Sequence, residues 1–126
     1  MMSGPSVVDA NVILRYLIGD GGDLADKARS IIESGEAYAY PEILAEVVYV
    51  LSGVYDVPRA EIGSAFRRLA NFMSFYDFDM LRGAFTLFEL STMDFVDCLL
   101  VARSIILKES IVSFDKQVMH HAGLES

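Results

Sequence analysis

Short apolar segments alternate with stretches of helical character along this chain, and the alternation limits the folds open to it. The segments with the composition of buried strands are Ser6–Ala10, Ala37–Tyr40, Met73–Asp77 and Ile111–Phe114. Apolar spacing and capping residues predict helices over 12–18, 23–35, 41–52, 58–72, 79–90 and 94–108, and no regular element after residue 115. Strands that alternate with helices predict a mainly parallel central sheet flanked by helices on both faces. Without a linker or repeat, we expect one α/β domain over residues 1–126.

The composition is that of a globular protein with a substantial core. Hydrophobic residues make up 53% of the chain, and no apolar run approaches the roughly 18 residues that a membrane span needs. The start, Met1–Pro5, lacks the basic and apolar regions of a signal peptide. The single cysteine, Cys98, excludes an intramolecular disulfide, and its apolar neighbours suggest a core thiol. These features predict a cytoplasmic protein with no membrane segment.

The charge balance limits the partners of the chain. The formal net charge is -8, and the pI is near 4.5. Non-specific affinity for nucleic acid depends on Lys and Arg, so a strongly acidic chain is a poor non-specific binder. The acid excess indicates a cation site, a basic partner, or both.

Four acidic residues stand inside or directly after apolar runs, where carboxylates are normally excluded. They are Asp9, Glu46, Asp97 and Asp115. A lone buried charge costs several kcal/mol or shifts its pKa, so acids at such places need compensation. A divalent cation would supply it if the fold gathers them, and oxygen-only ligands favour Mg²⁺ or Mn²⁺ over zinc. The adjacent pair His120–His121 lacks the spacing of a zinc site.

The predicted topology allows these acids to converge. Ligands of open parallel sheets collect at the carboxyl ends of the strands, and Asp9 and Asp115 each end a predicted strand. Asp94 and Asp97 lie three residues apart at a helix start, and Glu46 lies about one turn into its helix. Helix capping is the alternative for Asp9, Asp94 and Asp115, and for Asp94 it is favoured. A functional role is favoured over capping for Asp97, because its neighbours are apolar. It is also favoured for Glu46, because this residue lies too deep in its helix to act on the helix dipole.

Four ordered motifs together resemble those of the PIN-domain nucleases. Val7–Leu17 resembles the opening D-x-N-[VIL] motif, and Pro41–Val48 resembles the second motif with its acid. Met93–Ala102 is similar to the D-F-x-D-A-L-[IV]-A-A helix, and Val112–Asp115 matches the closing [ST]-F-D. The resemblance covers nearly the whole chain. Two departures are Cys98, where the family has a small Ala, and the short part that follows the closing motif.

The resemblance implies a metal-dependent nuclease. By it, Asp9, Glu46, Asp97 and Asp115 would be catalytic and hold Mg²⁺ or Mn²⁺, and Asn11, Asp94 and Ser113 would be supporting polar groups. The size and single-domain build are most similar to those of VapC-type toxins of toxin–antitoxin pairs. Members of the family typically cut RNA, form dimers and are inhibited by an antitoxin whose basic segment enters the acidic site. The expected partners are therefore RNA, a second copy of the chain and such an antitoxin.

Basic residues are the candidates for contacting an RNA backbone, because carboxylates alone repel phosphate. Arg15, Arg67, Arg68 and Lys116 are the candidates. Each can equally be a solvated surface charge. Their role stays open at the level of sequence.

Two other classes of function compete with the nuclease. Asp9–Asn11 resembles the nucleophile motif of haloacid-dehalogenase phosphoryl-transfer enzymes, but that chemistry needs an acid where Asn11 stands. A non-catalytic interaction module could use the acids only to receive a basic partner. Intact acids at all four motif positions favour the nuclease, and metal binding would distinguish it from the module.

Overall fold

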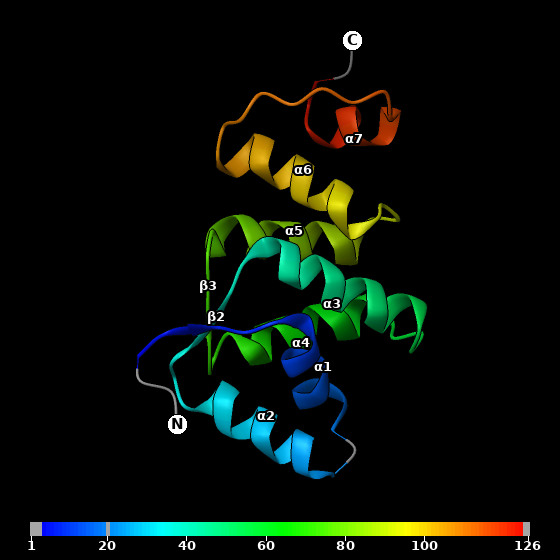
Figure 1. Ribbon diagram of the computed structural model, residues 1–126. Helices are drawn as coiled ribbons and strands as arrows, with labels where there is room; N and C mark the ends of the chain where they lie inside the picture. The colour runs from blue at the N-terminus through cyan, green and yellow to red at the C-terminus, as the bar shows by residue number, and fades with distance from the viewer. Residues whose placement is uncertain (1–3, 20, 125–126) are drawn as a thin grey trace. The chain divides into compact units, whose positions relative to one another are not determined.

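The computed structural model describes residues 4–19 and 21–124 (Figure 1), and two compact units divide the chain after Tyr76. The N-terminal unit contains β1 (Ser6–Val7), α1 (Ala10–Ile18), α2 (Asp23–Glu33), β2 (Ala37–Ala39), α3 (Pro41–Gly53), α4 (Arg59–Leu69) and β3 (Ser74–Phe75). The C-terminal unit contains α5 (Phe78–Leu90), α6 (Phe95–Ile106) and α7 (Lys116–His121). Three parallel strands and seven helices in the described residues confirm the predicted mixed α/β class.

The sheet of the N-terminal unit is parallel, with the strand order β1-β2-β3. Val7 is paired with Tyr38, and Tyr38 is paired in turn with Ser74. Beyond the paired residues, the amide of Val8 donates to the carbonyl of Tyr38 at 3.0 Å, and the amide of Tyr76 donates to that of Ala39 at 3.0 Å. The carboxyl ends of the three strands therefore lie along one edge of the sheet.

The two faces of this sheet differ in burial. Ala37, Ala39 and Phe75 point to the packed face and are at most 8% exposed. The alternate residues Val7 and Tyr76 are 49% and 53% exposed. Side chains of neighbouring strand residues point to opposite faces, so this pattern assigns a packed and a more open face to the sheet.

Three tyrosines gather on the more open face. The rings of Tyr40 and Tyr76 are stacked, with centroids 4.6 Å apart and an interplanar angle of 13°. Tyr38 meets both rings edge to face, at 6.0 and 5.5 Å. Partial burial and the neighbouring hydroxyl groups of Tyr38 and Tyr76 raise the pKa of Tyr40 above its ordinary value. The three rings form one aromatic cluster, here called the tyrosine cluster.

The first helix starts earlier than predicted, because Asp9 caps it. The predicted strand Ser6–Ala10 ends at Val7, and Ala10 already belongs to α1. The Asp9 carboxylate accepts a hydrogen bond from the amide of Val12 at 3.1 Å, which satisfies one of the amides left open at a helix start. The capping alternative for Asp9 is thus confirmed. At the other end Gly19, with φ of 55°, closes the helix in a conformation that glycine adopts at little cost.

The helices α3 and α4 follow the predicted capping signals. Pro41 stands in the first turn of α3, where its missing amide costs no hydrogen bond. Pro58 directly precedes α4. Leu44 on α3 and Ile62 on α4 are at most 2% exposed, so each helix places an apolar side in the core. Among the described residues, no helix combines the length and the apolar character that crossing a bilayer requires.

The C-terminal unit is built on the packing of α5 against α6. The ring of Phe95 on α6 lies 4.5 Å from that of Phe85 and 5.7 Å from that of Phe88, both on α5. Cys98 is fully buried on the same helix, which confirms the predicted core thiol. At the end of α6, Arg103 donates to both carboxylate oxygens of Glu109, at 3.2 and 2.7 Å. This paired contact ties the chain back onto the helix that it has just left.

The predicted strand Ile111–Phe114 is wrong. The described structure assigns these residues no strand, although Ile111 is buried. Val112 and Phe114 are 85% and 103% exposed. A local apolar pattern cannot supply the neighbouring backbone that a strand needs for its hydrogen bonds. The tail, for which no element was predicted, instead forms the helix α7.

Candidate metal centre

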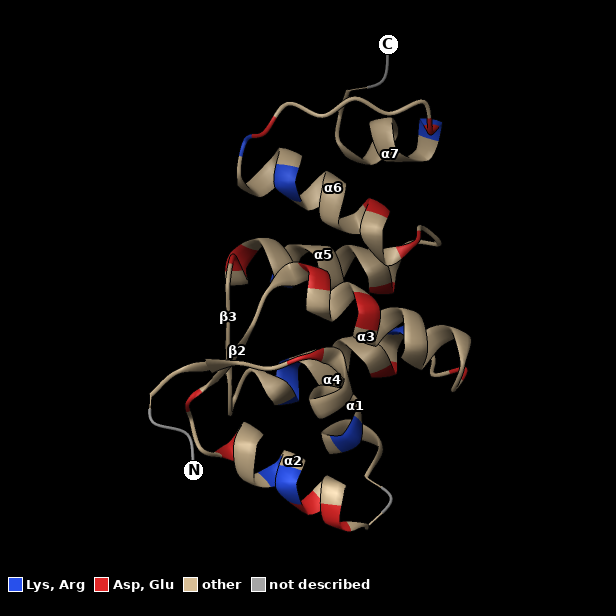
Figure 2. Cartoon of the chain, in the orientation of Figure 1, with Lys and Arg blue, Asp and Glu red and all other residues tan. Residues whose placement is uncertain are grey.

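Two of the four predicted acids lie in the N-terminal unit, at the starts of neighbouring helices. Asp9 is the exposed N-cap of α1, and Asn11 is exposed in the first turn of the same helix. Glu46 is exposed on α3, one turn after Glu42. Figure 2 shows acidic residues on this helix in red. The helices α1 and α3 follow the paired strands β1 and β2 and pack against each other. Asp9 and Glu46 therefore belong to the edge formed by the carboxyl ends of the strands.

Capping does not prevent Asp9 from binding a cation. Its hydrogen bond to Val12 uses only Oδ1. A carboxylate offers about four lone-pair sites on two oxygens, so Oδ2 can still coordinate a metal ion. The two roles predicted as alternatives for Asp9 are compatible.

The other two predicted acids lie in the C-terminal unit, together with Asp94. Asp97, in the first turn of α6, is partly buried. That burial and the negative charges of Asp115 and Asp94 raise the pKa of the Asp97 carboxyl above its ordinary value. The structure thus brings Asp94, Asp97 and Asp115 within electrostatic range of one another.

Asp94 occupies the N-cap position of α6, as predicted, but its side chain makes no capping hydrogen bond. Its backbone carbonyl accepts from the amide of Cys98 at 3.0 Å, the first hydrogen bond of the helix. The carboxylate of Asp94 is therefore not engaged in capping, and its charge acts on Asp97.

Asp115 was predicted to end a strand. It instead caps α7. Its Oδ1 accepts from the amides of Gln117 at 2.8 Å and Val118 at 3.2 Å. The hydroxyl oxygen of Ser113 accepts from the amide of Asp115 at 3.0 Å. Ser113 thus holds the backbone of Asp115.

The donor chemistry of these residues fits Mg²⁺ or Mn²⁺. The candidate ligands are carboxylates, and Asp97 carries a charge that its surroundings disfavour. A divalent cation is the natural partner of such a group, and oxygen ligands suit these two ions. Within residues 4–19 and 21–124, however, no three His, Cys, Asp or Glu side chains are arranged to hold a metal ion.

Replacing Asp97 with asparagine is expected to raise the Tm of the metal-free protein at pH 7 by a few degrees. The folded state raises the pKa of this carboxyl, so its ionised form destabilises the fold above that pKa. Below the ordinary pKa of 3.8 the carboxyl is protonated in both states, and the advantage of the variant should vanish. Circular dichroism melts in EDTA at pH 7 and at about pH 3 test this. Equal Tm values at pH 7 would contradict it.

The basic residues proposed for RNA contact lie on three different helices. Arg15 is half-buried in the last turn of α1. Arg67 and Arg68 are exposed in the last turn of α4, where they also suit the helix dipole. Lys116 is exposed at the start of α7, next to Asp115. Arg15 and Lys116 each lie on a helix whose N-cap is a predicted metal ligand, Asp9 for α1 and Asp115 for α7.

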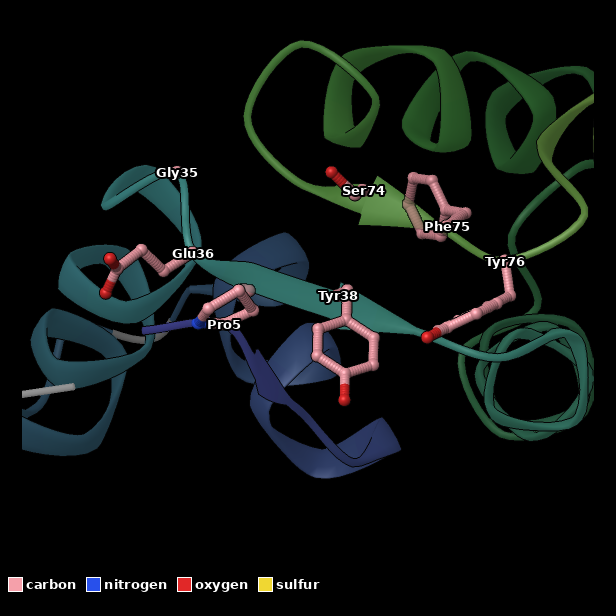
Figure 3. Close-up of a pocket in the computed structure, with 8 residues that line it drawn as sticks. Pro5, Gly35, Glu36, Tyr38, Ser74, Phe75 and Tyr76 are labelled. Atoms are coloured by element: carbon pink, nitrogen blue, oxygen red, sulfur yellow. The ribbon is translucent and has the colours of Figure 1, made fainter. Parts of the chain in front are cut away.

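A hollow of about 580 Å³ lies over the more open face of the sheet (Figure 3). Its lining includes Pro5, Glu36, Tyr38 and Tyr76, and none of the four predicted acids. The tyrosine cluster beside it was not predicted from the sequence. The alternation of small and aromatic residues in Ala37–Tyr40 was the available signal, because it separates one side of the strand from the other.

Comparison with known families adds one match. Residues 6–124 match the PIN domain. No curated protein and no solved structure matches the sequence significantly. The match covers nearly all of the described chain and both units.

Proposed function

The chain belongs to the PIN domain family, whose members are generally nucleases, and on that basis we propose that it hydrolyses RNA phosphodiester bonds with Mg²⁺ or Mn²⁺. The observation that carries this proposal is the family match over residues 6–124, combined with acids at all four motif positions. The oxygen-only donor set supports the choice of ion.

We assign the metal to the four motif acids. Asp9, Glu46, Asp97 and Asp115 would hold the ion. When bound, the ion lowers the pKa of a water molecule and offsets negative charge at the phosphate. Ser113 holds the backbone of Asp115, and Asp94 and Asn11 supply polar groups beside the acids on their helices. Lys116, Arg67 and Arg68 are proposed to attract the RNA backbone.

We further propose that the nuclease is the toxin of a type II toxin–antitoxin pair, acts as a homodimer in the cytoplasm and is inhibited by an antitoxin with a basic segment. The net charge of -8 and the exposed carboxylates of Asp9, Glu46 and Asp115 suit a basic partner. A small adjacent gene for a DNA-binding protein with a basic tail would support this assignment.

The nuclease proposal is tested with the wild-type chain and a panel of single-stranded RNAs, with DNA of the same sequences as controls. We expect RNA cleavage with Mg²⁺ or Mn²⁺, none in EDTA, and recovery when the metal is returned. Calorimetry should show binding of either ion. Equal cleavage under all conditions would rule out the metal mechanism. Absence of metal binding and of cleavage would favour a non-catalytic interaction module.

A further inference from the structure

We propose that a pocket between α1 and α3 binds a nucleotide next to the bond that is cleaved. The pocket has a volume of about 330 Å³ and lies wholly in the N-terminal unit. Asn11, Arg15 and Ile18 of α1 line one wall, and Val50 of α3 and Tyr55 line the other. The identity of the ligand as RNA rests on the proposed function, whereas the pocket itself does not.

Both walls of the pocket continue helices that carry predicted metal ligands. Asn11, Arg15 and Ile18 have the spacing of residues on one side of a helix, and this helix starts at Asp9. Val50 lies one turn after Glu46 on α3. A helix rises 1.5 Å per residue, so Arg15 lies roughly 9 Å along α1 from Asp9, and Val50 roughly 6 Å along α3 from Glu46. An RNA strand bound at these acids would reach the pocket within a nucleotide or two.

The lining has the chemistry of a nucleotide site. Arg15 is half-buried, and a guanidinium presents several donors in a fixed plane that suits phosphate. Tyr55 is 53% exposed and offers a ring on which a base can stack, whatever its identity. Asn11 is exposed and can donate to and accept from a base or ribose. Beside them, Ile18 and Val50 add one apolar side chain to each wall.

The charge of the pocket distinguishes it from the rest of this acidic chain. The residues that line it include one cation, Arg15, and no carboxylate, whereas the chain as a whole has a net charge of -8. A guanidinium beside an exposed aromatic ring suits an anionic ligand with a flat ring better than it suits a basic peptide. Single-stranded RNA supplies both a phosphate and a base.

Four variants test the pocket. Arg15→Gln removes the cation, Tyr55→Leu removes the ring, and Tyr55→Phe keeps the ring. Lys27→Gln removes a cation from the exposed side of α2 and is the matched control. Circular dichroism melts establish that each variant is folded. RNA binding is measured by fluorescence anisotropy in EDTA, and KM and kcat are measured with Mg²⁺.

We expect Arg15→Gln and Tyr55→Leu to weaken RNA binding roughly 10-fold and to raise KM by a similar factor, with little change in kcat. Tyr55→Phe keeps the ring and should retain more binding than Tyr55→Leu, and Lys27→Gln should behave as wild type. Shortening the RNA one nucleotide at a time, from either end, should weaken wild-type binding sharply at one position. Tyr55→Leu should remove most of that step.

The outcomes separate the pocket from the nuclease proposal. Weaker binding by the two variants without cleavage by any protein would support the pocket and refute the nuclease. Cleavage by wild type with unchanged binding and KM in both variants would overturn the pocket alone. Failure of wild type to bind RNA, or equal losses in all four variants, would also overturn it.

Discussion

Replacing Asp9 or Asp97 with asparagine lowers metal-dependent RNA cleavage by at least about 100-fold, which is the expected result for a direct metal ligand. Residues that only support metal ligands typically contribute about 10- to 100-fold, so a ligand should contribute more. Asparagine preserves the size of the side chain and can still cap α1 from position 9. The loss should therefore appear in kcat without a comparable loss of Tm.

Glu42 provides the matched control for this prediction. It is exposed in the first turn of α3, one turn before Glu46, where an acid suits the helix dipole. Glu42→Gln should retain near wild-type cleavage, whereas Glu46→Gln should lose it. Initial rates on one RNA, with Mg²⁺ at saturation, measure the difference. Similar rates for the two variants would show that Glu46 is not a ligand.

Truncating Phe95 to alanine is expected to destabilise the C-terminal unit by about 3–5 kcal/mol. The ring is 5% exposed and contacts Phe85 and Phe88 of α5, so its removal leaves a cavity where α5 and α6 pack. A loss of this size is a large part of the roughly 5–15 kcal/mol by which domains are stable. Urea unfolding followed by far-UV circular dichroism measures the change.

The neighbouring Val96 is the control for the loss of apolar bulk. Its side chain is 63% exposed, so Val96→Ala should change the unfolding midpoint little. Both positions lie between Asp94 and Asp97, so each replacement affects the same turn of α6. If the two variants unfold at the same urea concentration, Phe95 does not anchor this helix as the structure indicates.

The sequence was informative wherever local chemistry determined the structure. Pro41 correctly marked the start of α3, and the apolar segments near residues 6, 37 and 74 correctly marked the three strands. These signals act through backbone dihedrals and side-chain spacing, which neighbouring residues alone determine. The predicted parallel arrangement followed from the intervening helices and is confirmed.

Local sequence patterns do not determine the structure where it depends on residues remote in the sequence. The apolar run Ile111–Phe114 has the composition of a buried strand, but whether such a run joins a sheet depends on a distant neighbour. The helix α7 was missed because it has only six residues, too few for a clear apolar period. Capping was the predicted alternative for Asp115 and is confirmed, although the helix that Asp115 caps was not predicted.

For the candidate site too, some features could be predicted from the sequence and others could not. The four acids could be selected from the sequence because apolar neighbours make a carboxylate conspicuous. The raised pKa of Asp97 could not be predicted from the sequence, because it depends on burial and on Asp115, eighteen positions away. The joint action of all four acids stays a prediction, and the asparagine variants test it.

The tyrosines give the protein an intrinsic optical probe. The chain has no tryptophan, and its six tyrosines all precede the boundary after Tyr76. Near-ultraviolet absorption and emission therefore report almost entirely on the N-terminal unit, and the stacked rings of Tyr40 and Tyr76 make that signal sensitive to the order of the sheet. Helix content, measured in the far ultraviolet, reports on both units. Whether the two spectral regions change together on heating will reveal whether the chain melts as one cooperative domain.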